Sequence, residues 1–120
     1  MKNIKFRAWE PNSKVMYPMA MVGEPANPSV WTDKNWRECT EAVVIMQFTG
    51  LKDKKGVEIY EGDIIKDHRR DSLFEVVYYE DSARFDGKDL TGKHYGVTFG
   101  ESFYIKVIGN IYENGDLLKN

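Results

Sequence analysis

Apolar and polar residues alternate along several short stretches of the chain, and a period of two predicts strands rather than helices. The first stretch, residues 4–9, places Trp9 on the outward side of the strand, opposite Phe6. Pro11 follows after Glu10 and favours a turn, because its ring presets one backbone angle. We therefore expect a β-hairpin over residues 4–18.

The next region, residues 18–37, has no regular period and is interrupted by three prolines and a glycine. It predicts a long loop that carries Trp31 and Trp36, with one helical turn beginning near Thr32 or Asp33. A loop of this length is uncommon in a small domain and is often functional or flexible. A linker between two subdomains is the alternative, and we favour it.

Apolar, β-branched residues return at residues 43–48, which predict an interior strand because branched side chains lose rotamer freedom in a helix. In the stretch "GLKDKKGVEIYEGDIIK" that follows, Asp53 and Gly56 occupy the first and last positions of a four-residue turn. Gly62 and Asp63 then predict a second change of direction before another short strand. Strands joined by such corners are typical of a small, strongly bent β-barrel.

Two further strands are predicted, residues 73–81 and residues 103–112. The second of them places Tyr104 and Tyr112 outward together with Asn110, and its Gly109 predicts a bend or bulge. The charged residues 80–94 predict an exposed loop or a loose hairpin. One helical turn is expected near the end of the chain.

These elements predict a mainly β protein with little helix. We expect a single domain over residues 1–120, with the hairpin and irregular segment in residues 1–40 and the barrel core in residues 41–120. Cys39 is the only cysteine and cannot form an intrachain disulfide. The sequence has neither an apolar signal core at its start nor a run of about 20 apolar residues. We therefore expect a soluble cytoplasmic protein without membrane contact.

The sequence contains no pattern for catalysis, a metal or a cofactor, and we expect a protein that is not an enzyme. The three glycines of the quoted stretch match neither phosphate-binding motif. Asp86 and Asp89 lack the alternate spacing and the distal Glu of a calcium loop. Cys39, His68 and His94 have no recognised zinc spacing. Cys39 could act as a nucleophile with a distant histidine, but no glycine elbow precedes it, so a structural cysteine is the preferred interpretation.

Non-enzymatic binding is the function that the residues favour, and two kinds of partner remain open. For a protein partner or a second copy of the chain, the candidate contacts are the aromatic residues that dominate interface energies: Trp9, Trp31, Trp36, Tyr104 and Tyr112. The tryptophans of the irregular segment could instead hold that segment to the barrel. The alternative is a nucleic-acid-associated accessory protein. Because the net charge is −2, it requires a local basic face built from Lys52, Lys54, Lys55, Arg69, Arg70 and Lys106.

Three blocks together resemble the YopX family of small phage and prophage proteins: "IKFRAWEPNSKVMY", "VVIMQFTGLKDKKGVEIYEGDII" and "VIGNIYENGDLL". The chain departs from the family at Gly115, where proline is usual, and over residues 80–96. The resemblance implies a mainly β fold related to partly open SH3-like barrels, a phage or prophage origin and a location in the host cytoplasm. It implies no established activity and no catalytic residues. The residues Asp53, Gly56, Gly62, Asp63 and Gly109 are then structural turn and corner residues.

Overall fold

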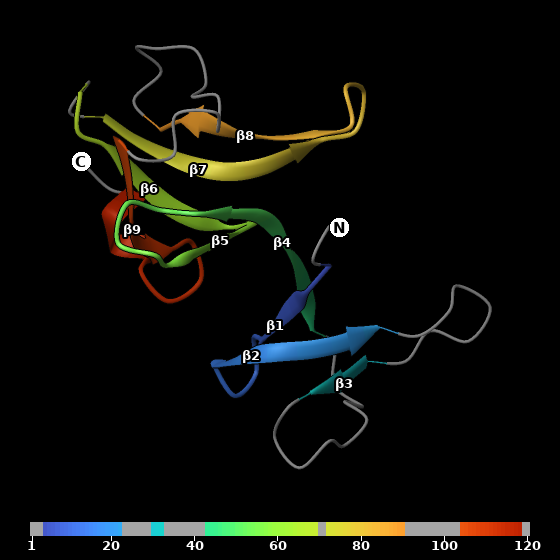
Figure 1. Ribbon diagram of the computed structural model, residues 1–120. Coiled ribbons are helices and arrows are strands. Elements are labelled where there is room, and N and C mark those ends of the chain that lie inside the picture. The colour runs from blue at the N-terminus through green and yellow to red at the C-terminus, as the bar shows by residue number, and fades with distance from the viewer. Residues whose placement is uncertain (1–3, 23–29, 33–42, 70–71, 91–103, 119–120) are drawn as a thin grey trace. The chain divides into compact units, whose positions relative to one another are not determined.

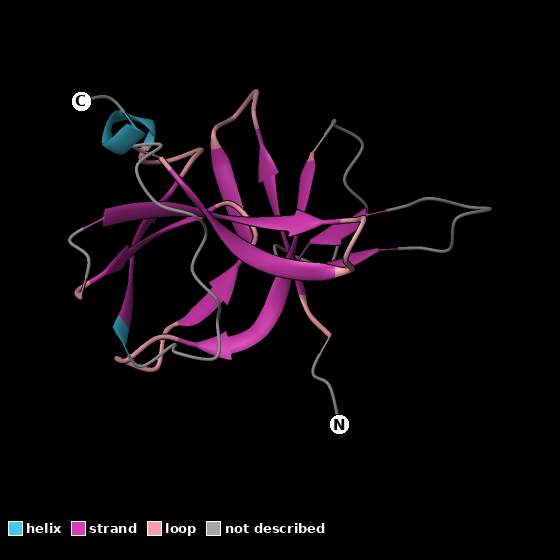
Figure 2. Ribbon diagram, turned by 90° about the horizontal axis from the view of Figure 1, so that it is seen from above, coloured by secondary structure: helices cyan, strands magenta, loops and turns pink. Residues whose placement is uncertain are grey.

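A computed structural model describes residues 4–22, 30–32, 43–69, 72–90 and 104–118 of the chain. The regular elements of the described residues are strands, apart from one short 3₁₀ helix near the C-terminus (Figures 1 and 2). The elements are β1 (Phe6–Glu10), β2 (Val15–Val22), β3 (Val30–Thr32), β4 (Val44–Lys52), β5 (Glu58–Tyr60), β6 (Asp63–Asp67), β7 (Ser72–Tyr79), β8 (Arg84–Asp89), β9 (Ile105–Asn110) and η2 (Gly115–Leu118). The mainly β prediction is confirmed.

The chain divides into two compact units, unit 1 (Met1–Phe48) and unit 2 (Thr49–Asn120). The boundary falls inside β4, whose first half pairs with β1 and whose second half lies next to β5. The division therefore lies later in the chain than residue 40, where the predicted hairpin and irregular segment end. β4 belongs in part to the N-terminal unit and not only to the barrel core.

Unit 1 is built on the predicted hairpin of β1 and β2. The two strands pair antiparallel from Glu10 and Val15 at the turn to Phe6 and Ala20, with a register shift between Phe6 and Ala8. Tyr17 donates its hydroxyl hydrogen to Glu10 at 3.1 Å across the pair. β3 then pairs with the end of β2, so the region expected to be a loop contributes strand at both its start and its middle.

Unit 2 contains a four-stranded antiparallel sheet in the order β8-β7-β6-β9, in addition to β5 and the end of β4. Its core is formed by the fully buried side chains of Ile59, Ile65, Phe74, Val76 and Ile105, with Leu51, Phe85 and Val107 packed against them. Each of the six strands β4 to β9 supplies at least one of these residues. Apolar side chains from all six strands therefore share one core, as expected for a partly open SH3-like barrel.

Glycines with positive φ angles form the corners of unit 2. Gly56 has a φ angle of 84° and ends the turn between β4 and β5, and Gly62 has a φ angle of 82° between β5 and β6. L-residues rarely adopt this conformation, whereas glycine does so without steric cost. Gly62 is also fixed by two backbone bonds, from its N–H to Val76 O and from the N–H of Ile111 to its own carbonyl, both 2.9 Å. The predicted corners are confirmed.

A bulge interrupts the pairing of β6 and β9 where the sequence predicted one, beside Gly109. Ile64 pairs with Gly109 but the adjacent Ile65 pairs with Val107, so one residue of β9 is left over. The prediction that Asn110 points outward is wrong, because this side chain is buried at 7% exposure. Its Oδ1 accepts hydrogen bonds from the N–H groups of Tyr112 and Glu113, at 3.0 and 2.8 Å. A buried Asn thus organises the turn that leads to η2.

The charged region after β7 is more regular than its composition predicted. β7 and β8 form an antiparallel hairpin with continuous register from Phe74 opposite Asp89 to Tyr79 opposite Arg84. Ala83 adopts a positive φ angle of 50° in the connecting turn. Tyr78 packs edge-on against Phe85, with ring centroids 5.0 Å apart. Cross-strand aromatic packing therefore stabilises a hairpin whose sequence is otherwise dominated by charge.

Candidate binding surface

The carboxylate of Asp53 organises the turn between β4 and β5. Its Oδ1 accepts hydrogen bonds from the N–H groups of Lys55 at 2.8 Å and Val57 at 2.9 Å. Its Oδ2 accepts a 2.9 Å hydrogen bond from the N–H of Val107 in β9. One buried carboxylate therefore closes a local turn and joins it to a strand that is 54 residues away in the sequence.

The environment of Asp53 lowers its pKa below the usual value of 3.8. Burial of the carboxylate alone would raise the pKa. The N–H donors of Val107, Val57 and Lys55 and the positive charge of Lys106 act in the opposite direction and outweigh burial. Asp53 is therefore ionised at neutral pH, and the turn keeps its three charge-assisted hydrogen bonds.

Backbone hydrogen bonds hold three segments of unit 2 side by side. The N–H of Lys54 donates to Ile105 O at 3.1 Å, and the N–H of His68 donates to Tyr104 O at 3.1 Å. The turn after β4 and the connection after β6 therefore both lie against the start of β9. Their position is set by main-chain geometry and not by flexible side chains.

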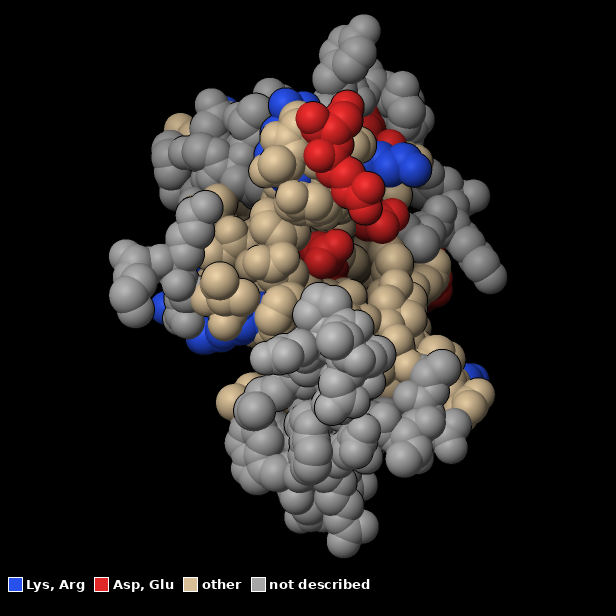
Figure 3. Space-filling view, turned by 90° about the vertical axis from the view of Figure 1, so that its right-hand side faces the viewer, with Lys and Arg blue, Asp and Glu red and all other residues tan. Residues whose placement is uncertain are grey.

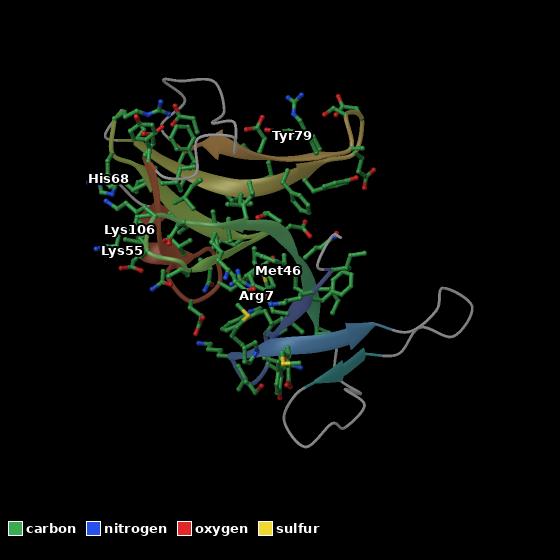
Figure 4. All side chains as sticks on the ribbon, viewed as in Figure 1. Arg7, Met46, Lys55, His68, Tyr79 and Lys106 are labelled. Atoms are coloured by element: carbon green, nitrogen blue, oxygen red, sulfur yellow. The ribbon has the colours of Figure 1, made fainter. Side chains whose placement is uncertain are left out.

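Basic side chains gather where these three segments meet. Lys66 in β6 lies directly opposite Lys106 in β9, so the two side chains share one face of the sheet. We call the resulting surface the basic edge, and its members are Lys54, Lys55, Lys66, His68, Arg69 and Lys106. All of them are exposed except Lys66, which is half-buried. Figure 4 shows Lys55, Lys106 and His68 together on one side of unit 2, with Tyr79 apart from them.

Arg69 is held in a fixed orientation within the basic edge. Asp67, which is completely buried, accepts the backbone N–H of Arg69 at 2.9 Å and pairs with its Nη2 at 3.2 Å. The guanidinium lies over the ring of Tyr104, 4.2 Å from the ring centroid. Tyr104 itself is 37% exposed. A planar cation and an aromatic ring are thus stacked before any ligand is bound.

Two exposed acidic side chains of unit 2 lie apart from the basic edge. Glu80 and Asp81 are exposed in the turn between β7 and β8. Figure 3 views the side of the molecule on which this turn lies and shows Asp and Glu side chains gathered there. The acidic residues within the basic edge, Asp53 and Asp67, are buried and already hydrogen-bonded. The basic edge therefore combines exposed cations with two buried carboxylates, although the net charge of the whole chain is −2.

The aromatic residues proposed for a protein contact are not gathered into one exposed patch among the described residues. Trp9 is 7% exposed, so the expectation that it lies outward is wrong. Tyr112 is half-buried, and Tyr104 is the most exposed of the described candidates. Trp31 is on β3, and its side chain lies outside the described residues, as does the whole of Trp36.

The basic candidates fare differently. Lys54, Lys55, Arg69 and Lys106 lie on segments that backbone hydrogen bonds hold side by side. Lys52 is exposed at the end of β4, and Arg70 lies outside the described residues. The sequence prediction missed Lys66 and the role of Asp67. The pattern along "DIIKD" could not have indicated either, because Ile64 and Ile65 point to opposite faces and both are fully buried.

The residues tested for metal or catalytic chemistry do not form a site where the structure describes them. Asp86 and Asp89 lie in β8 and not in a loop, and Asp86 pairs with Arg84 at 3.5 Å. The described ranges contain no group of three His, Cys, Asp or Glu side chains that could hold a metal ion. Cys39 and His94 lie outside those ranges. No helix in the described part of the chain is long and apolar enough to cross a membrane.

Fold and surface together define a small, mainly β protein with an SH3-like unit that carries a basic edge. The family model described as "YopX protein" matches residues 5–119, and the chain belongs to the YopX family. Among solved structures, protein EF1440 from Enterococcus faecalis is similar, with a TM-score of 0.70 and 31% identity over 99% of this chain and 100% of that one. No curated protein matches the chain.

Proposed function

We propose that this chain is a non-enzymatic binding module, encoded by a bacteriophage or prophage, whose basic edge contacts nucleic acid in the bacterial cytoplasm. The observation that carries the proposal is the convergence of Lys54, Lys55, Lys66, Arg69 and Lys106 on one side of unit 2. Neutralised phosphates and their released counterions provide most of the free energy of nonspecific binding to nucleic acid. A local cluster of cations can provide this free energy even in a chain whose net charge is slightly negative.

The arrangement of the lysines supports a polyanion as the ligand. Lys54, Lys55 and Lys106 are exposed, so their ammonium groups are accessible to phosphates. Their backbones are fixed by the hydrogen bonds of Asp53 and Ile105. A cluster of like charges is unfavourable within the protein, and an extended anion would relieve that repulsion.

Titration of the full chain into fluorescently labelled oligonucleotides tests the proposal by anisotropy. Probes of about 30 nucleotides, single- and double-stranded and of mixed sequence, exceed the span of one small barrel. We expect binding at about 50 mM salt that weakens steeply towards physiological ionic strength. Absence of binding to every probe at low salt would contradict the proposal.

A protein partner is the second candidate, because the hairpin tip of β7 and β8 exposes a different set of contact residues. Tyr78 is 42% exposed and Tyr79 is 38% exposed, and the guanidinium of Arg84 lies 6.0 Å from the ring centroid of Tyr79. Tyr and Arg are enriched among the residues that dominate interface energies. The partner would be a host or phage protein, or a second copy of the chain.

A pull-down from bacterial lysate, with and without nuclease, separates the two candidates. Nucleic-acid binding predicts co-purified material that is lost on nuclease treatment. A protein contact at the hairpin tip predicts one partner that survives nuclease and is lost in the double variant Tyr79→Ser and Arg84→Ser. Partner capture that survives nuclease and is unaffected by this variant would reject the hairpin tip.

A further inference from the structure

We infer that Arg69 and Tyr104 form a base-stacking platform within the basic edge, so that the nucleic acid it prefers is single-stranded. The inference rests on the proposed function and adds the chemical class of the ligand. Phosphate contacts by lysine do not distinguish single strands from duplexes. Unstacked bases, however, present flat faces that pair with aromatic rings and guanidinium planes.

The geometry of Arg69 favours stacking on a base over a simple charge contact. Asp67 engages both Nε at 3.4 Å and Nη2 at 3.2 Å, which fixes the plane of the guanidinium. One face of that plane covers the Tyr104 ring at 4.2 Å. The Arg69 side chain is 33% exposed, and Tyr104 is 37% exposed. The stacked pair is therefore preformed and accessible, and a base can extend the stack with little loss of side-chain entropy.

The surroundings of the pair suit a strand that passes across it. His68 is exposed between Asp67 and Arg69 in the sequence, and its N–H is bonded to the carbonyl of Tyr104. Lys106 lies in β9, two residues after Tyr104, and Lys66 lies directly opposite Lys106. Cations for the phosphates thus lie close to the flat surface for a base, the combination found in proteins that bind single strands without sequence preference.

A substitution that keeps packing but removes the ring tests the inference. Tyr104→Leu removes the aromatic face, and Arg69→Lys keeps the positive charge but removes the planar group. The matched control is Tyr79→Leu. Tyr79 is exposed to the same extent as Tyr104 and lies under the guanidinium of Arg84, and both Tyr79 and Arg84 are outside the basic edge. Thermal unfolding of each variant identifies any change caused by loss of folding.

The expected result is a difference between probes. Loss of one base–aromatic stack lowers affinity by about tenfold or more, so Tyr104→Leu and Arg69→Lys should weaken binding to the single-stranded probe by that factor and leave duplex binding unchanged. Tyr79→Leu should change neither. If Tyr104→Leu and Arg69→Lys lower the affinity for both probes equally, or for neither, the stacking platform is overturned. Binding by the wild-type protein would still uphold the proposed function in that case. A wild-type protein that binds neither probe would overturn both.

Discussion

The carboxylate of Asp53 accepts a 2.9 Å hydrogen bond from the backbone N–H of Val107, and this bond joins the turn after β4 to β9. Asp53 and Val107 are each adjacent in the sequence to lysines of the basic edge. Lys54 and Lys55 follow Asp53, and Lys106 precedes Val107. The spacing of the lysines therefore depends on a buried carboxylate that does not face the ligand.

Replacement of Asp53 by Asn should destabilise unit 2. The substitution keeps the shape of the side chain but removes the charge and places an amide NH₂ group against backbone N–H donors. Leaving one of these buried donors without an acceptor costs about 1–3 kcal/mol. The free energy of unfolding, measured by urea denaturation, should fall by that amount for Asp53→Asn. The exposed Asp81→Asn is the control and should change it little; equal values for the two variants would contradict the role assigned to Asp53.

Acidification should remove the contribution of Asp53. Its pKa in the folded protein lies below the value of 3.8 that describes the unfolded chain, so the folded state binds the proton less readily. The resulting stability is fully present above pH 3.8 and is lost as the pH falls through the folded pKa. The difference in unfolding free energy between wild type and Asp53→Asn should therefore be constant near neutral pH and shrink below about pH 4. A difference that is independent of pH down to acid unfolding would contradict this account.

Gly109 should not tolerate a side chain. A Cβ atom at this position would lie 2.6 Å from Asn114 Oδ1 and 2.9 Å from Asn114 Cβ, and so would require Asn114 to move. That movement would break the 3.1 Å hydrogen bond from the N–H of Asn110 to Asn114 Oδ1. Gly109→Ala should therefore lower the free energy of unfolding by about 1–3 kcal/mol.

Gly115→Ala provides the matched control, because no atom lies within 4 Å of a Cβ placed at Gly115. It should change the unfolding free energy by less than about 0.5 kcal/mol, the usual range for surface substitutions. Equal destabilisation by both variants would contradict the contact with Asn114 as the reason why position 109 requires glycine.

Local signals in the sequence are sufficient to predict the corners of the fold. Gly56 and Gly62 stand where turn chemistry predicts them, and both have positive φ angles. The Asp53 turn was also predicted, because Asp at the first position of a turn bonds the following N–H groups. The bond to Val107 could not be predicted, since it joins residues that only the tertiary fold brings together.

The candidate site was harder to predict for the same reason. Lys55 and Lys106 are 51 positions apart in the sequence and become neighbours through two hydrogen bonds of the tertiary fold, from Lys54 to Ile105 and from Val107 to Asp53. The side chain of Trp9 is buried, although the period of two along the strand predicts that it points outward. The strand β8 could not be predicted from its own residues, because they are mostly charged. It is stabilised by cross-strand pairs with β7.

The most direct test of the central claim compares two double variants that lose the same charge. Lys55→Gln with Lys106→Gln removes two cations from the basic edge, whereas Arg84→Gln with Lys88→Gln removes two exposed cations of β8, at the opposite edge of the four-stranded sheet from β9. The salt dependence of single-strand affinity is measured for each. We expect the slope of log affinity against log salt to flatten by about 1.4 for the first variant, since each lost phosphate contact contributes about 0.7, and to stay at the wild-type value for the second. Equal slopes for the two variants would contradict a nucleic-acid site at the basic edge.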